Sequence, residues 1–510
     1  MSDHQRGYSD LSGQPVSLWI DTTPETGYPS LQGDVRVDVA IVGGGMAGLL
    51  AATMLKESGR SVAVIEARKV AQGVSGNTTA KVTSQHHLCY ASMLGAFGRD
   101  DALAYASANQ AAIEGIRVLA ERHGIDCDFT ATDAYVYSHD EAEVETLKEE
   151  VEAARSLGLP AAFTAQVPLP FDVAGAAVFA DQARFHPRSF LLGLAAALPG
   201  DGSHVFERTR VLDVNDGQPC TVETEWGTVT ADDVIIASHY PLNDRGPYTL
   251  RLKPKRSLVL GVLPEAPLPA GLERSMLIST DPMHSLRTQK WRDREMLLVG
   301  GEPFKTGQAD TVELFLNLER WTRERFGDLR VVYRWATQDN VTPDNVPFTG
   351  LLAPGAEHCF VTTGYRGWGM TNSYASAALL HDLILGRENP AAAIYDPNRL
   401  KLQGLSQVVT EAADAVRHLV ADRFRSVDAH SIPPGSGGVI KEGIRPVAVY
   451  RDEDGNEHRM SAVCTHLGCV VGWNEAERSW DCPCHGSRFA PTGAVLQSPA
   501  IQRLEPDEPE

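Results

Sequence analysis

The chain has 510 residues, a length typical of about three domain-sized units. Its hydrophobic and charged fractions, 43% and 22%, are ordinary for a globular protein. With 46 Lys and Arg against 66 Asp and Glu, the net charge is −20. This charge would repel nucleic-acid phosphates and anionic lipid, so we expect neither nucleic-acid nor membrane partners.

The amino-terminal residues and the apolar runs give no sign of export. The first ten residues, MSDHQRGYSD, lack the basic head and the apolar run of a secretory signal. The best apolar stretch, residues 190–198, is too short to cross a bilayer. We therefore expect a soluble, cytoplasmic protein.

Three sections follow one another along the chain. Residues 1–34 are polar and interrupted by Pro and Gly, which predicts an irregular N-terminal arm. In residues 35–428, strand-like apolar runs alternate with helical patterns, which is typical of an α/β body. A Pro/Gly cluster at 433–438 then precedes short β runs with a turn at Asp454-Gly455, so we expect a separate all-β domain over 429–510. Within the body, the patterns predict strands at 38–42, 61–66, 233–237 and 296–300, and helices at 46–58, 101–123, 187–198 and 400–425.

A glycine-rich motif lies near the start of the body. The expected strand at 38–42 leads into GGGMAG, a G-x-G-x-x-G pattern, and then into an expected helix. Gly43 permits a tight turn, Gly45 lets the backbone approach a pyrophosphate, and Gly48 lets helix and strand pack closely. A second strand ends at Glu66, 18 residues past Gly48, near the spacing of about 20 expected for a ribose-binding acid. The order and spacing predict a dinucleotide site; the acid disfavours NADP but does not separate FAD from NAD.

Two further segments of the body extend this pattern. The run from Asp38 to Glu66, followed by GVSGNTT at 73–79, resembles the flavin-dependent D-amino-acid oxidase/glycine oxidase superfamily, and GYRGWGMT at 364–371 resembles that family's closing flavin loop. The resemblance covers about residues 35–390. It implies a Rossmann-type FAD-binding domain, built from about 35–90, 180–240 and 340–390, with an inserted mixed-sheet substrate domain in the remainder. The FAD-binding residues that it implies are Gly43, Gly45, Gly48, Glu66, Ser75, Thr79, Gly364, Gly367, Gly369, Met370 and Thr371.

The sequence also departs from this family in informative ways. Trp368 stands where the family often has His, and Arg366 where it often has Ser, so the resemblance does not identify the substrate. No Cys or His occupies the position of a covalent flavin linkage, and we expect noncovalent FAD. A second strand–glycine motif–helix unit is missing from the sequence, so we expect the electrons to come from an organic substrate rather than from NAD(P)H.

Two titratable side chains follow the flavin loop and are the candidate catalytic residues. Lys81 falls where the resemblance places a residue near the isoalloxazine, and His86 could remove a proton from a substrate C–H or N–H. A surface or phosphate-binding lysine and a structural histidine are the alternatives. His186-Pro187 is expected to begin a helix, and the basic run at 251–256 is expected to form a solvated strand face.

Half of the eight cysteines crowd into twenty-one positions near the carboxyl end. Cys464-Thr-His466 and Cys482-Pro-Cys484-His485 supply a C-x-H and a C-x-x-H pattern. Two thiolates and two imidazoles in this arrangement suit a Rieske 2Fe–2S cluster, in which His replaces Cys on one iron. Structural zinc is the alternative, because two Cys and two His also bind zinc, but zinc fingers lack C-x-H. The four scattered cysteines are expected to be small buried hydrophobes.

The segment of about 430–505 is similar to the Rieske proteins of cytochrome bc-type complexes. In that group Ser487 corresponds to a serine that hydrogen-bonds a bridging sulfur, whereas Phe489 stands where high-potential members have Tyr. Loss of that hydroxyl donor implies a lower reduction potential. The resemblance assigns four residues as cluster ligands, Cys464, His466, Cys482 and His485. It also implies a disulfide between the two ligand loops, which joins Cys469 to Cys484.

Together these features predict an α/β plus β architecture: an FAD-dependent oxidoreductase followed by a small all-β Rieske domain. The expected function is oxidation of a small organic substrate, an amine or amino-acid derivative, by hydride transfer to FAD. Electrons would then pass singly to the cluster and to an external one-electron acceptor. Two alternatives stay open: a simple oxidase, in which O₂ reoxidises FAD and the cluster is auxiliary, and a non-catalytic electron-carrier or redox-sensing protein. A Rieske oxygenase is not expected, because the sequence lacks a His pair near a carboxylate for a mononuclear iron.

Overall fold

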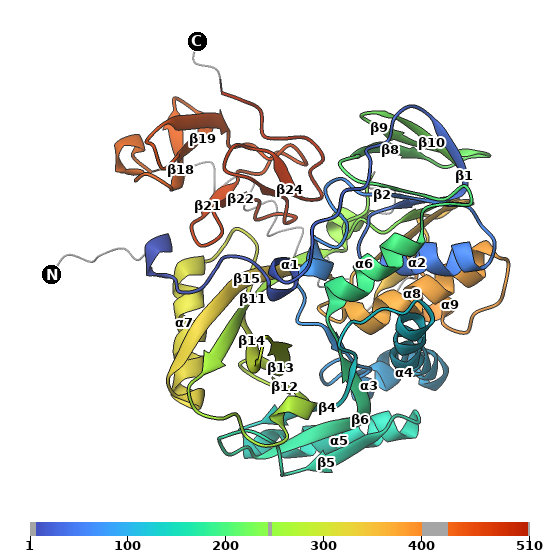
Figure 1. Cartoon of the computed structure of the whole chain (residues 1–510), viewed down its shortest axis with the longest axis vertical. Coiled ribbons are helices and arrows are strands. Elements are labelled where there is room, and N and C mark those ends of the chain that lie inside the picture. The colour runs from blue at the N-terminus through green and yellow to red at the C-terminus, as the bar shows by residue number, and fades with distance from the viewer. Residues whose placement is uncertain (1–6, 243–246, 400–426, 508–510) are drawn as a thin grey trace.

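The computed structural model describes residues 7–242, 247–399 and 427–507 of the chain (Figure 1). A large body contains two sheets with helices packed on them, and a small all-β domain follows it along the chain. None of the helices in these ranges is both long and apolar enough to cross a membrane. The helix expected over 400–425 lies outside the described residues.

The first sheet of the body is mainly parallel and has eight strands. Its path runs β16-β17-β10-β1-β2-β7, with the pair β8 and β9 beside β10. The core strands are buried and lie parallel to one another, as apolar runs covered by helices predict. The bounds are β1 (Val35–Val42), β2 (Val62–Ile65), β7 (His204–Phe206), β8 (Val211–Asn215), β9 (Cys220–Thr224), β10 (Gly227–Ile236), β16 (Phe348–Leu351) and β17 (Cys359–Thr363).

The second sheet has nine strands and mixed directions. Its path runs β15-β11-β14-β13-β12-β4-β6-β3, and β5 pairs with β6. Strands β12 and β4 pair in parallel, whereas the pairs β12–β13, β13–β14 and β4–β6 are antiparallel. The bounds are β3 (Lys81–Val82), β4 (Thr130–Ser138), β5 (Ala161–Thr164), β6 (Gly175–Arg184), β11 (Lys253–Pro264), β12 (Ser275–Ser279), β13 (Ser285–Trp291), β14 (Arg294–Lys305) and β15 (Leu329–Val341).

Helices cover both sheets, and their ends follow the expected signals. Gly45 caps the start of α2 and Gly59 follows its end with φ +85°, a conformation that glycine adopts easily. His186 caps α6 and accepts a hydrogen bond from the Ser189 N–H, which confirms the expected helix start. Helix α2 packs on α8 and α6, and α7 packs on β14 and β11. The bounds are α1 (Leu18–Asp21), α2 (Met46–Glu57), α3 (Tyr90–Phe97), α4 (Arg99–Arg122), α5 (Val144–Ser156), α6 (Pro187–Ala197), α7 (Thr311–Phe326), α8 (Gly369–Ile384) and α9 (Ala392–Tyr395).

The N-terminal arm is irregular apart from short helical turns, and it lies along the body. The Trp19 side chain is fully buried and its indole N–H donates to the Thr78 carbonyl. Ser17 donates to the Gly76 carbonyl. Closer to the amino terminus, the backbone of Gln14 forms two hydrogen bonds with β15. The Gln14 N–H donates to the Val332 carbonyl, and the Gln14 carbonyl accepts from the Arg334 N–H. The arm therefore supports the loop at 73–79.

The C-terminal domain consists of two small antiparallel sheets. The first contains β18 (Gly437–Glu442), β19 (Arg445–Arg451) and β20 (Glu457–Ser461), with the expected Asp454-Gly455 turn between the last two. The second contains β21 (Gly472–Asn474), β22 (Ser479–Asp481), β23 (Arg488–Phe489) and β24 (Val495–Gln497).

This domain is docked on the body beside α7 and β15 (Figure 1). Ala476 packs into the apolar cluster beneath α7, and Thr311 donates a 2.7 Å hydrogen bond to the Asn474 side chain. The Arg256 guanidinium, 1% exposed, contacts both carboxylate oxygens of Glu477 at 2.6 and 2.7 Å. Buried apolar and ionic contacts therefore hold the two parts together.

Candidate functional sites

A cavity of about 1270 Å³ opens at the carboxyl ends of β1 and β10, between the two sheets and the C-terminal domain. Its volume exceeds the roughly 300–1,000 Å³ of ordinary small-molecule pockets. Most of the predicted FAD-binding and catalytic residues line it: Gly43, Gly45, Glu66, Ser75, Thr79, Lys81, Gly367, Gly369 and Met370. Gly48, Gly364, Thr371 and His86 are not among its lining residues.

The glycine-rich turn has the geometry that its motif predicts. Gly43 has φ +113°, and a β-carbon there would lie 2.5 Å from the Ala237 carbonyl oxygen. A β-carbon on Gly48 would lie 2.0 Å from the Gly43 carbonyl oxygen, which explains a packing role away from the cavity. The turn ends at the amino terminus of α2, where backbone N–H groups and the helix dipole favour an anion.

Glu66 lies beside this turn at the end of β2. Its carboxylate accepts hydrogen bonds from the backbone N–H groups of Gly44 and Arg68, both at 2.9 Å. Burial raises the pKa of the carboxyl group, and the two backbone donors oppose the shift. The side chain is thus held in place in the cavity wall, where a ribose-binding acid is expected.

Lys81 reaches the cavity from the short strand β3. Its ammonium donates to Thr79 Oγ1 and Ser285 Oγ, both at 3.2 Å, and the residue is 8% exposed. Burial and, secondarily, the Arg287 guanidinium lower the pKa of Lys81 to about 7. A lysine in this state can be neutral near neutral pH and can accept a proton.

His86 occupies a different environment from Lys81. Its Nδ1 is 2.6 Å from the Tyr105 hydroxyl, and its Nε2 lies 2.9 Å from Thr83 O and 3.0 Å from Thr371 Oγ1. The ring stacks on Trp368, and burial lowers its pKa to about 3. Both ring nitrogens are engaged by neighbours, which favours the structural alternative over proton transfer to a substrate.

The next residue, His87, lines the cavity, as does His239, whereas His86 does not. His87 has φ +63° in the left-handed region, and its Nε2 lies 3.4 Å from the Ser279 carbonyl oxygen, which is not a partner of His86. Sequence reasoning missed it, because adjacent histidines give no signal that one faces a ligand and the other the core.

The closing loop precedes α8 and borders the cavity. The Gly367 N–H donates a 2.5 Å hydrogen bond to the Asp339 carboxylate, and burial raises the pKa of Asp339 to about 6. Thr371 faces away from the cavity and donates to Thr83 O at 2.8 Å. The loop is therefore fixed to β15 on one side and to the segment after β3 on the other.

The basic run at 251–256 is not simply a solvated strand face, as the sequence suggested. Arg256 is buried and paired with Glu477, and Arg251 lies 4.1 Å from the Phe348 ring centre. Lys253 and Lys255 border the cavity. The prediction failed because the covering acid comes from the C-terminal domain, 221 positions away in the sequence.

The second candidate site lies in two loops of the C-terminal domain. Cys464 and Cys482 are buried, and their thiols interact with each other. The rings of His466 and His485 lie 5.1 Å apart at 85°. The two thiols thus form one pair and the two imidazoles another, and they come from loops rather than from a helix, which suits a Rieske 2Fe–2S cluster better than a helix-borne zinc site.

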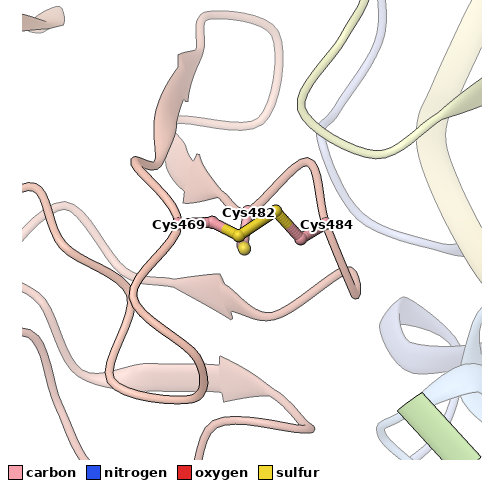
Figure 2. Close-up of side chains that lie close together, drawn as sticks. All are labelled: Cys469, Cys482 and Cys484. Atoms are coloured by element: carbon pink, nitrogen blue, oxygen red, sulfur yellow. A yellow bond between two sulfur atoms is a disulfide. The ribbon is translucent and has the colours of Figure 1, made fainter. Parts of the chain in front are cut away.

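Cys469 and Cys484 form a disulfide that joins the two ligand loops. Figure 2 shows Cys482 immediately beside this bridge, and the three sulfur atoms lie within 4.8 Å of one another. The pairing leaves Cys464 and Cys482 as the thiols available to iron. Ser487 interacts with Cys464 and accepts from the Ala500 N–H.

The two sites lie against each other. Gln338, in the cavity wall, donates from Nε2 to the Gly486 carbonyl at 3.0 Å, one residue after His485. Gly486 has φ +78°, and a β-carbon there would lie 2.6 Å from Pro254 Cβ, so the close approach requires glycine. Tyr240, which follows the cavity residue His239, places its ring 6.1 Å from the His466 ring.

Comparison with known protein families agrees with this geometry. The family model described as FAD dependent oxidoreductase (DAO) matches residues 38–383. The Rieske [2Fe-2S] domain model matches residues 423–506. The two matches correspond to the body and to the docked C-terminal domain.

Individual relatives support the same division. The Bacillus subtilis (strain 168) protein YhfW, whose name describes a Rieske 2Fe-2S iron-sulfur protein, is 36% identical over 498 residues, covering 96% of this chain and 97% of that one. Gamma-glutamylputrescine oxidoreductase of Escherichia coli (strain K12) is 27% identical over 373 residues, covering 70% of this chain and 86% of that one. The crystal structure of glycine oxidase from Geobacillus kaustophilus shares the fold, with a TM-score of 0.62 at 22% identity, covering 72% of this chain and 99% of that one. The chain therefore belongs to the FAD-dependent oxidoreductase family, and it binds FAD in its body and a 2Fe–2S cluster in its C-terminal Rieske domain.

Proposed function

We propose that the protein oxidises a small amine or amino-acid derivative and delivers the electrons singly, through its Rieske domain, to an external one-electron acceptor. When bound, FAD accepts a hydride from the substrate and the cluster accepts one electron at a time. We assign Cys464, His466, Cys482 and His485 as the cluster ligands, and the cavity residues around the glycine-rich turn and the closing loop as the FAD site.

The observation that carries the proposal is the contact between the two sites. Gln338 spans from the cavity to the Gly486 carbonyl, and Tyr240, next to the cavity residue His239, packs against His466. The docked arrangement supports intramolecular transfer, because it maintains a short separation that two free proteins would reach only by collision.

The charge of the cavity favours a substrate with an anionic group. Burial lowers the pKa of Lys255, and the nearby cations Arg366 and Lys253 lower it further. A bound carboxylate would relieve the mutual repulsion of these three cations. The names of the relatives, gamma-glutamylputrescine oxidoreductase and glycine oxidase, refer to an amine and an amino acid, which supports this substrate class.

Lys81 is the proposed proton acceptor. Its neutral form, favoured above a pKa of about 7, can take a proton from a substrate ammonium and leave the amine lone pair free to assist loss of the hydride. Thr79 and Ser285 hold the Lys81 nitrogen in position.

The test is rapid anaerobic mixing of the holoprotein with a library of amines and amino acids. An active compound should bleach the flavin absorbance, and loss of the oxidised cluster's absorbance should follow at a rate independent of protein concentration. His485→Cys should retain substrate-dependent flavin bleaching and lose normal delivery to a one-electron acceptor. A cluster that stays oxidised would favour the simple oxidase, and a flavin that no compound bleaches would favour the carrier.

A further inference from the structure

One end of the FAD cavity is built by the Rieske domain. Residues 495–498, from β24 and the turn after it, line the cavity together with Ala500 and Ile501. These residues belong to neither of the cluster-ligand loops. The match to the FAD-dependent oxidoreductase model ends at residue 383, whereas residues 495–501 fall within the Rieske match, so this wall comes from outside the matched oxidoreductase segment.

The wall lies at the end where the adenosine is expected. Arg68, whose N–H holds the Glu66 carboxylate, donates from Nη1 to the Leu496 carbonyl at 3.1 Å. Ser498 donates to the Ser238 carbonyl at 3.3 Å, just after β10. The segment therefore covers the ribose acid and the adjacent strand ends.

Apolar packing secures the same segment. Ile501 packs against the buried cluster of the body that includes Val42, Ile65 and Leu242. Val42 and Ile65 end the two strands on either side of the glycine-rich turn. Movement of the Rieske domain would expose this apolar surface and open the cavity to water.

The position of the wall depends on contacts elsewhere in the interface. A β-carbon on Gly307, between β14 and α7, would lie 2.9 Å from the Asp481 carbonyl oxygen and 3.0 Å from Pro483 N. Gly307 does not line the cavity. A larger residue there should therefore displace the Rieske domain without contacting the bound FAD.

We propose that the Rieske domain is a structural part of the FAD site, and that residues 495–501 retain the cofactor by closing its adenosine end. FAD retention then depends on domain docking, and the cofactor enters before the domain docks or while it is displaced. This inference is independent of substrate turnover and of electron transfer.

The test measures FAD dissociation from the full-length holoprotein, followed by the rise in flavin fluorescence after dilution. Gly307→Val should accelerate release by about tenfold, the change that about 1.4 kcal/mol of lost binding free energy produces. Gly327→Val is the matched control: Gly327 has φ +72°, close to the +71° of Gly307, but a β-carbon there meets nothing within 4 Å. Iron content should be unchanged in Gly327→Val.

A second pair of variants probes the wall directly. Ile501→Ala should also accelerate FAD release, whereas Ile444→Ala, the same substitution at a Rieske-domain residue that is 95% exposed, should not. Faster release in either test variant, with both controls at the wild-type rate, supports the proposal. Wild-type release rates in both Gly307→Val and Ile501→Ala would overturn it.

Discussion

Removal of the interdomain carboxylate should destabilise the protein more than any exposed charge change. Glu477 is 17% exposed, and it contacts Arg256 through two hydrogen bonds and Arg488 at 3.0 Å. Asp481 contacts Arg488 at 2.9 Å, so Arg256 of the body meets a Rieske-domain group of one cation, Arg488, and two anions, Glu477 and Asp481. Glu477→Gln leaves one buried positive charge uncompensated, and arginine does not lose its proton in proteins.

The expected cost follows from this burial. Removal of one partner of a buried ion pair costs about 3–5 kcal/mol. Glu453→Gln is the matched control, because Glu453 is 66% exposed and pairs with Arg478 at the surface, where a pair contributes about 0–1 kcal/mol. The replacement Arg256→Met with Glu477→Leu should recover much of the loss, since no unpaired charge then remains.

The assay is urea unfolding of the full chain, followed by loss of the cluster's visible absorbance. Glu477→Gln should shift the midpoint to lower urea, and Glu453→Gln should leave it close to wild type. A Glu477→Gln protein within about 1 kcal/mol of wild type would show that the pair is screened by water and does not hold the domains together.

Three further outcomes are expected. Gly45→Val should yield protein without the yellow cofactor, because the Gly45 β-carbon would enter the cavity 3.2 Å from Ser75 Oγ; full FAD occupancy by absorbance would contradict the pyrophosphate assignment. The ratio kcat/KM should rise with pH through about 7 as Lys81 loses its proton, and Lys81→Met should abolish this limb of the pH profile; a variant that keeps it would exclude Lys81 as the base. Replacement of Cys469 and Cys484 by Ser should leave about two irons per chain in a less stable domain, measured by iron analysis and thermal unfolding; loss of all iron would make one of them a ligand.

The features best predicted from the sequence are those encoded locally. The strand, the glycines and the helix of the dinucleotide motif lie within a short segment, and β1, α2 and β2 follow the expected bounds within a few residues. The Rieske domain is also predicted locally, because its Cys and His motifs lie in two short segments, and the Rieske model matches residues 423–506.

Features that depend on distant partners were not predicted. The burial of Arg256 depends on Glu477 in another domain, and a basic run has the same appearance whether water or a carboxylate covers it. The roles of His86 and His87 differ because Tyr105 and Thr371 bind the first. The local sequence pattern does not predict these tertiary hydrogen bonds.

The N-terminal arm has a consequence for the order of folding. The arm is synthesised before the body, yet its backbone partners Val332 and Arg334 lie more than three hundred positions later. The arm cannot acquire its final hydrogen bonds until β15 has emerged, although folding during synthesis generally begins with N-terminal segments. Since Ser17 and Trp19 bind the carbonyls of Gly76 and Thr78, the loop at 73–79 should acquire its final rigidity only late in biosynthesis. A stalled chain that ends before residue 332 would carry the glycine-rich motif complete and its supporting arm unplaced.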